Sequence, residues 1–130
     1  MHALGRHLLL ELFDCEVAAI NSIETVKGAL VEAANRAQAT IVDVIFHEFN
    51  PFGISGVVVI AESHMSVHTW PEYRYAAVDI FSCGDTLKPD LAASYLVEQL
   101  GADRASVVEL HRGVFVHSSV PLPHKPMAVR

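Results

Sequence analysis

The sequence predicts an α/β (α+β) fold, a two-layer sandwich in which a mostly antiparallel sheet carries two helices on one face. Segments with strand patterns outnumber helical ones, and several of them are joined by short turns. Only two segments repeat apolar residues at the helical period. The length of 130 residues is typical of a single domain, so we expect one domain over residues 1–130.

The first half of the chain predicts a helix with one strand before it and one strand after it. Residues 4–13 are rich in leucine, which indicates a strand. Asn21 and Glu24 have the spacing of a capping box, and apolar residues then recur at helical spacing, so we expect a helix over about residues 22–38. Residues 39–49 are β-branched and extended, and a turn containing proline and glycine follows them.

The second half predicts further strands and a second helix. Pro89 suits a first helical turn, and apolar residues follow it on one face, so the helix is expected to begin there. Residues 119–130 hold three of the six prolines, and we expect them to form a flexible tail. The expected strands are residues 54–62, 63–70, 75–82, 107–111 and 114–117.

The composition excludes several classes of partner. The net charge is −6 and the nine basic residues are scattered, so we expect binding to neither nucleic acid nor a membrane surface. The apolar runs are too short for a membrane span or a signal peptide, which favours a cytoplasmic protein. A hydrophobic fraction of 52% is high for so small a domain and favours a homo-oligomer.

Two cysteines are too few for a disulfide framework, and in a reducing compartment we expect free thiols. Cys15 ends the first strand and is expected to be a small buried residue. Cys83 directly precedes a turn formed with Gly84 and Asp85, where we expect its thiol to be accessible from solvent.

A polar stretch in the middle of the chain indicates a site. Residues 61–70 hold a carboxylate, hydroxyls and two imidazoles directly after the apolar run 57–60, and buried polar groups are costly unless they have partners. The ordinary alternative is a strand beside a wet groove, since alternation places Ser66, His68 and Trp70 on one face. Spacing alone does not decide between the two.

Two common kinds of site fit this stretch poorly. His64, His68 and Cys83 are candidate metal ligands, but four residues of strand span roughly 13 Å. Two imidazoles that far apart cannot share a zinc ion at bond lengths of about 2 Å, so we expect no metal. Ser63 and His68 lack the Gly-x-Ser-x-Gly elbow of many serine hydrolases.

Four motifs occur in order between residues 5 and 84. They are Gly5-Arg6-His7-Leu8, Phe46-His47-x-Phe49-x-Pro51-x-Gly53-x-Ser55-Gly56, Ala61-Glu62-Ser63-His64-x-x-x-His68-Thr69-Trp70-Pro71-Glu72-Tyr73 and Phe81-x-Cys83-Gly84. Their order and spacing resemble those of the short prokaryotic S-adenosylmethionine decarboxylase proenzymes, and the likeness covers residues 1 to about 113.

This resemblance implies that the chain cuts its own backbone between Glu62 and Ser63, and that Ser63 becomes a pyruvoyl group, a covalent cofactor. The products would be a β chain of residues 1–62 and an α chain of residues 63–130. The family forms dimers with sites near the interface, so the resemblance also implies a homodimer of αβ units.

The resemblance further implies roles in the chemistry. Ser63 Oγ attacks the Glu62 carbonyl to form an ester, Ser55 donates a hydrogen bond to the developing charge, and His68 removes the Cα proton of the ester. The pyruvoyl carbonyl then forms a Schiff base with the substrate and accepts electrons as carbon dioxide leaves. Cys83 resembles the family's proton donor to the product.

The implied substrate is S-adenosylmethionine. Phe49 resembles the aromatic residue that stacks on its adenine, Glu72 resembles the carboxylate that holds the ribose hydroxyls, and Trp70 lines the same pocket. Aromatic faces also attract a sulfonium by cation–π interaction. The product, decarboxylated S-adenosylmethionine, is an aminopropyl donor for spermidine biosynthesis.

Two acids depart from the family's pattern. Alternation places Asp43 on the face of His47 and Phe49 and directs Glu48 the other way. The ordinary interpretation is that both are solvated. Some homologues on this scaffold decarboxylate L-ornithine or L-arginine, whose basic side chains need a carboxylate partner, so that activity is the alternative. A less favoured hypothesis is an inactive partner subunit, although the residues for self-processing are all present.

Overall fold

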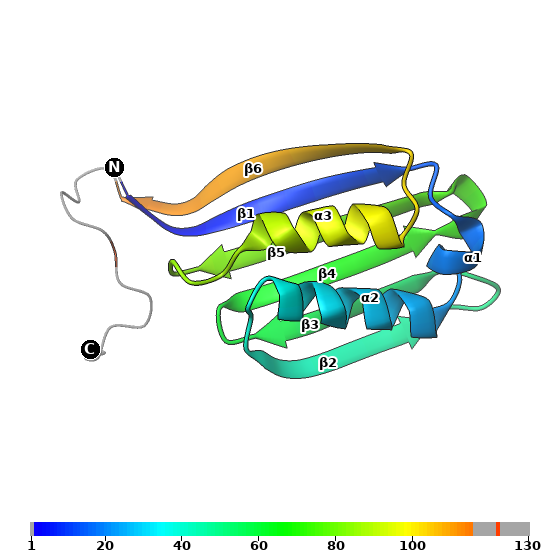
Figure 1. Ribbon diagram of the computed structural model, residues 1–130, viewed down its shortest axis with the longest axis horizontal. Coiled ribbons are helices and arrows are strands. Elements are labelled where there is room, and N and C mark those ends of the chain that lie inside the picture. Colours follow the sequence, from blue (N-terminus) through cyan, green and yellow to red (C-terminus); the bar gives the residue numbers. More distant parts are fainter. Residues whose placement is uncertain (1, 116–121, 123–130) are drawn as a thin grey trace.

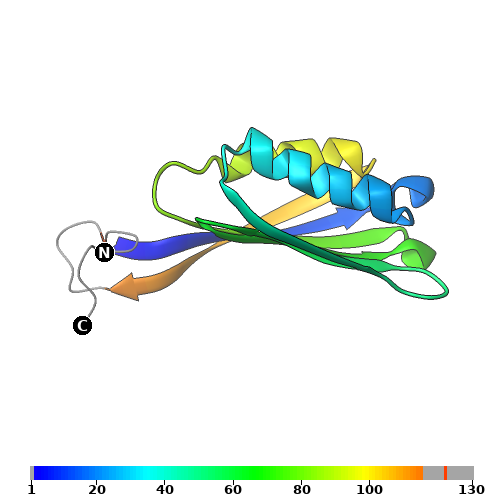
Figure 2. The ribbon, with the colours of Figure 1, turned by 90° about the horizontal axis from the view of Figure 1, so that it is seen from below.

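The computed structural model describes residues 2–115 and 122 and shows a six-stranded antiparallel sheet with its main helices on one face (Figures 1 and 2). The predicted fold class is confirmed. The strands are β1 (His2–Phe13), β2 (Ile41–Glu48), β3 (Ile54–Ile60), β4 (Ser63–Trp70), β5 (Tyr75–Cys83) and β6 (Arg104–Phe115). The helices are α1 (Val17–Ile20), α2 (Ile23–Arg36), the 3-10 turn η1 (Pro71–Tyr73) and α3 (Pro89–Gln99).

The strand order is β2-β3-β4-β5-β1-β6, so consecutive strands β2 to β5 are neighbours and β1 enters the sheet beside β5. The expected hairpins are confirmed, because β3 pairs with β4 and β4 with β5. The C-terminal part differs from expectation, since residues 104–115 form one continuous strand along β1. Residues 116–117 and almost all of the expected flexible tail lie outside the described residues.

The start of the first long helix also differs from expectation. Ser22 is the N-cap of α2, and its hydroxyl accepts a hydrogen bond from the Thr25 backbone at 3.2 Å. Asn21 does not cap this helix because it ends the short helix α1, where its N–H bonds to Val17 O. A four-residue helix is too short to show a helical period, so the sequence did not predict α1.

The core lies between the helices and one face of the sheet. Strand alternation sends Leu8, Leu10 and Leu12 to the same side, where each is at most 2% exposed. Met65 of β4 is fully buried there, against a helical layer that includes Leu30. Because both long helices pack on this face, the other face of the sheet carries no helix within residues 2–115 (Figure 2).

Both cysteines are free thiols. Cys15 is fully buried at the end of β1, as predicted, and Cys83 is partly exposed. Among the described residues, no helix has the length and apolar character needed to cross a membrane.

Truncation of the core should destabilise the protein far more than the same truncation at its surface. We expect Leu10→Ala to lower the free energy of unfolding by about 2–5 kcal/mol, because Leu10 is 1% exposed and a cavity would remain. Leu91→Ala on the outer side of α3, where the side chain is 50% exposed, should cost less than about 1 kcal/mol. Urea denaturation followed by circular dichroism measures both, and equal losses would contradict the core described above.

Candidate active site

The helix-free face carries Ser55, His68, Trp70 and Cys83, four of the side chains that the sequence singled out. The register aligns residues of this face in rows across the strands. One row contains Ile45, Val57, Ser66, Asp79, Leu9 and Val108. Polar residues therefore lie in the centre of the face, and apolar residues lie toward both edges.

The Glu62–Ser63 bond lies in the tight turn between β3 and β4 at one end of this face. Ser63 has a φ of 150°, a value that L-residues rarely adopt and that costs free energy. The carbonyl oxygen of Glu62 accepts a hydrogen bond from the Cys83 backbone N–H at 2.9 Å. The carboxylate of Glu62 accepts another from the Thr40 backbone at 3.1 Å. The bond is thus both strained and polarised by a fixed donor.

Cys83 ends β5 beside this turn, and Gly5 of β1 lies opposite it in the ladder. A Cβ atom at Gly5 would lie 3.2 Å from Cys83 Sγ and 2.7 Å from the ring of Phe81, so a side chain there would displace the thiol or the ring. Burial raises the pKa of the Cys83 thiol above its ordinary value. The thiol is therefore protonated at neutral pH and able to donate a proton.

A second group of predicted residues lies at the other end of the same strands. Ser55 Oγ and His68 Nδ1 are 2.8 Å apart on paired strands. They line a pocket of about 280 Å³ together with Phe49, Trp70 and Glu72. The structure thus brings together five of the predicted site residues. Asp43 and Glu48 do not line this pocket.

Trp70 also borders a second, larger pocket, of about 400 Å³, on the same face. Its wall includes Glu11 and Tyr75, whose hydroxyl donates to a Glu11 carboxylate oxygen at 2.5 Å. Burial, followed by this carboxylate, raises the pKa of Tyr75 to about 12, so the phenol is neutral. The indole is therefore accessible from two directions.

Within one chain the structure does not bring the two ends of the face together. Ser63 and His68 are five positions apart on the straight strand β4, which corresponds to roughly 16 Å at about 3.3 Å per residue. His68 therefore cannot reach the Cα proton of Ser63 in its own chain, and neither can Ser55, its cross-strand partner.

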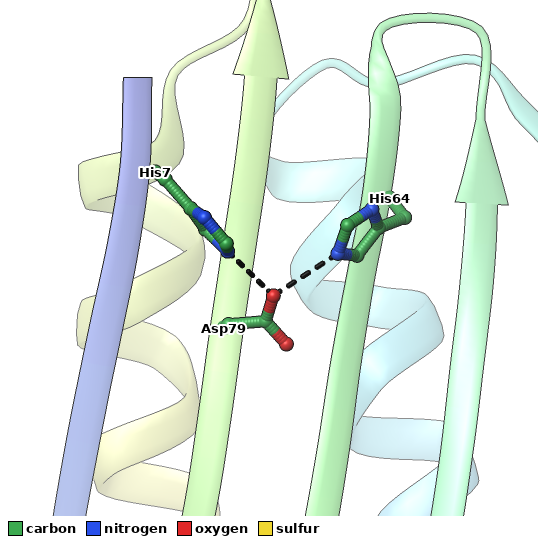
Figure 3. A group of neighbouring side chains, drawn as sticks. All are labelled: His7, His64 and Asp79. Carbon is green, nitrogen blue, oxygen red and sulfur yellow. Dashed lines mark hydrogen bonds and ion pairs between the residues drawn. The ribbon is translucent and has the colours of Figure 1, made fainter. Parts of the chain in front are cut away.

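Between the two ends lies a cluster that sequence reasoning missed. Asp79 Oδ2 is 2.6 Å from His7 Nε2 and 3.0 Å from His64 Nε2 (Figure 3). Ser66 Oγ donates to the other oxygen of Asp79. The sequence groups His64 with His68 and Cys83 as candidate metal ligands. In the structure, the atoms that lie close enough to share an ion belong instead to His7, His64 and Asp79. Alternation along β4 is consistent with the shared face of His64 and Ser66. That His7 of β1 and Asp79 of β5 lie beside them follows only from the pairing of the strands, which the sequence does not give.

Comparisons with known proteins show which family this chain resembles. The family described as S-adenosylmethionine decarboxylase matches residues 6–113. The chain is 57% identical to an S-adenosylmethionine decarboxylase proenzyme of Thermodesulfovibrio yellowstonii, covering 96% of this chain and 93% of that one. It is 45% identical to one of Acidithiobacillus ferrooxidans over 93% and 91% of the two chains. The crystal structure of the Aquifex aeolicus adenosylmethionine decarboxylase superposes with a TM-score of 0.84 at 34% identity, covering 92% and 99%.

The raised pKa of Cys83 predicts an unusual pH dependence of alkylation. Because the thiolate is the reactive form, iodoacetamide should modify Cys83 readily only at a higher pH than it modifies a free cysteine peptide. Peptide mass spectrometry over a pH series measures the modified fraction. Cys15, which is fully buried, serves as the internal control and should stay unmodified. Alkylation of Cys83 at or below the pH of the free peptide would contradict the assigned environment.

Proposed function

Since this chain belongs to the S-adenosylmethionine decarboxylase family, we propose that it cuts itself at Glu62–Ser63 and then decarboxylates S-adenosylmethionine at sites shared by two copies. The family membership makes it a carboxy-lyase of the proenzyme type, which carries a pyruvoyl group formed by self-cleavage. The product would donate aminopropyl groups in spermidine biosynthesis. The observation that carries the proposal is the strained, hydrogen-bonded peptide bond at Ser63.

The surroundings of Ser63 fit the formation of a pyruvoyl group. Ser63 Oγ would attack the Glu62 carbonyl carbon, and the negative charge developing on the oxygen would be held by the Cys83 N–H that already donates to it. Transfer of the Glu62 acyl group from the Ser63 nitrogen to Oγ would give an ester. A base must then remove the Ser63 Cα proton so that the Glu62 carboxylate leaves and the chain breaks. The dehydroalanine left at residue 63 would take up water and lose ammonia to give the pyruvoyl group. The cut would leave chains of residues 1–62 and 63–130.

A second copy of the chain would supply that base. His68 is roughly 16 Å from Ser63 along its own strand, but a two-fold rotation about a line across the strands near the Ser66–Asp79 row reverses β4. If two helix-free faces pack in this way, the Ser63 of one protomer lies opposite the partner's His68. Each dimer would then hold two identical sites.

The character of the helix-free face supports such a dimer. Ile45, Val108 and Leu110 lie on it and are 57%, 53% and 42% exposed, although large apolar side chains favour burial. A symmetric dimer covers both copies of one face with a single contact. We place this dimer in the cytoplasm, where Cys15 and Cys83 would stay reduced.

The pocket beside His68 suits a nucleoside with a positive charge. Phe49 offers a face for stacking on adenine, Glu72 offers a carboxylate for the ribose hydroxyls, and Trp70 can interact with the sulfonium. An ornithine or arginine substrate would need a further carboxylate, and neither Asp43 nor Glu48 lines the pocket. We therefore propose S-adenosylmethionine rather than a basic amino acid as the substrate.

Cys83 would finish the reaction. The pyruvoyl group supplies an electron-accepting carbonyl that makes loss of carbon dioxide feasible. Cys83 Sγ, neutral because burial raises its pKa, then donates the proton that replaces the carboxyl group. Because Cys83 ends β5 beside the Glu62–Ser63 turn, its thiol proton would lie close to a pyruvoyl group at residue 63.

Intact mass spectrometry tests the cut directly. The purified protein should give two chains that divide at Glu62–Ser63, and the second should be lighter by one ammonia than a chain beginning with serine. Ser63→Ala should give a single uncut chain without decarboxylase activity, whereas Ser94→Ala on α3 should be cut normally. Two fragments from Ser63→Ala would refute the proposed cleavage site.

Complementation tests whether the site is shared between copies. We would express a tagged His68→Ala chain together with a Ser63→Ala chain. If the partner's His68 acts on Ser63, the His68→Ala chain should yield a residue 63–130 fragment lighter by one ammonia, which neither variant yields alone. Repeating the experiment with a Ser63→Ala/His68→Ala partner removes the only His68 and should abolish this fragment. Absence of the fragment from the first pair would contradict a shared site.

A further inference from the structure

Asp79 joins three strands through one carboxylate. It lies in the middle of β5 and accepts from His7 of β1 and from His64 of β4 (Figure 3). It also accepts from Ser66 of β4. The Asp79 side chain is 22% exposed, so these hydrogen bonds are partly shielded from water. Two of the three donors thus come from the first four residues of β4, directly after Ser63.

The partners of the two ring nitrogens of His7 indicate that the cluster is held by hydrogen bonds and not by a metal ion. Arg112 lies 3.0 Å from His7 Nδ1, and because a guanidinium only donates, Nδ1 must accept. The ring proton of a neutral His7 is therefore on Nε2, which donates to Asp79. A metal bound at Nε2 would move the proton to Nδ1, where it would face an N–H of Arg112. The cluster therefore favours a carboxylate with three donors over a metal site.

Self-cleavage would change what holds β4 in place. Before the cut, the turn at residues 61–62 ties the start of β4 to β3. After the cut, residue 63 is a chain end, and chain ends open more readily than strand interiors. Cys83 lies on the same strand and the same face as Asp79, so a bond from β4 to Asp79 also fixes β4 relative to Cys83.

We propose that Asp79 is a positioning residue that holds the new end of β4 against β5 after the chain is cut. The proposal rests on the proposed self-cleavage. His64 and Ser66 are the attachment points on β4, and His7 with Arg112 orients the carboxylate from β1 and β6. Small displacements of reacting groups slow a reaction strongly, so this attachment keeps residue 63 and the Cys83 thiol in register.

Hydrogen exchange in cut and uncut protein tests the proposal. Amide exchange of residues 64–66 would be measured for Asp79 and for Asp79→Ala, each in the self-cleaved protein and in the uncut Ser63→Ala background. In cut protein, Asp79→Ala should speed exchange by about tenfold, as expected for the loss of two or three hydrogen bonds at a chain end. In uncut protein the same substitution should change exchange little, because the turn still holds the strand.

Two matched variants sharpen the comparison. Asp79→Asn keeps an oxygen for the two histidines and offers an amide to Ser66 Oγ, so it should restore most of the protection. Glu109→Ala removes an exposed carboxylate that pairs with Arg6 on the opposite face, and should leave residues 64–66 unchanged. In steady-state assays Asp79→Ala should lower kcat by about tenfold or more and leave KM nearly unchanged, since the substrate pocket does not include Asp79.

Several results would overturn the proposal. Equal acceleration of exchange in cut and uncut protein would show a general stabilising role, and no acceleration in cut protein would show no role. An Asp79→Ala chain that folds but stays uncut would place Asp79 in the cleavage step instead. Stoichiometric binding of zinc chloride that is lost in Asp79→Ala would make the cluster a metal site. A wild-type chain of intact mass would refute self-cleavage itself, and is recognised before any exchange is measured.

Discussion

The hydrogen-bonded ladder on both sides of β4 fixes the distance between the two groups of reactive residues, Ser63 with Cys83 at one end and Ser55 with His68 at the other. It pairs Ser55 with His68 and Ser63 with Ser82, and therefore separates the two groups of reactive residues by the length of the strand. A paired central strand cannot bend to bring its ends together. The chemistry implied by the family needs both groups at one place, so the rigidity of β4 is the physical argument for the shared site that we propose.

The helical layer determines which face of the sheet is used. Helices α2 and α3 cover one face and bury the alternating residues that point to it, while the polar and apolar residues of the other face remain open. A face that combines polar and apolar side chains is unfavourable in water, because its apolar part stays exposed. It is also unsuitable for a purely apolar core, where its polar groups would lack partners. The proposed second copy would resolve both conditions, because it would cover the exposed aliphatic residues and enclose the polar groups where a low dielectric strengthens their interactions.

Sequence patterns predicted most strands and both long helices, and the resemblance supplied the proposed site residues within the four motifs, five of which the structure brings together around one pocket. What they could not predict depends on contacts between distant segments. The N-cap of α2 is Ser22 and not Asn21, because Asn21 ends the short helix α1, which the sequence did not predict. Asp79 accepts hydrogen bonds from two neighbouring strands because β5 lies between β1 and β4. One result could have been predicted from the sequence. The argument that keeps His64 and His68 apart along a strand applies also to Ser63 and His68, which are one position further apart.

The site must satisfy opposite requirements before and after the cut. Before it, strain at Ser63 raises the free energy of the intact chain, and the Cys83 N–H would stabilise the negative charge that develops on the Glu62 oxygen in the transition state. After the proposed cut, both the strain and the covalent tether would be gone, and residue 63 would still have to remain beside the thiol of Cys83. Backbone pairing alone weakens toward a free end. A side-chain attachment whose partners all lie beyond residue 63 survives the cut unchanged, and the bonds from His64 and Ser66 to Asp79 are of this kind.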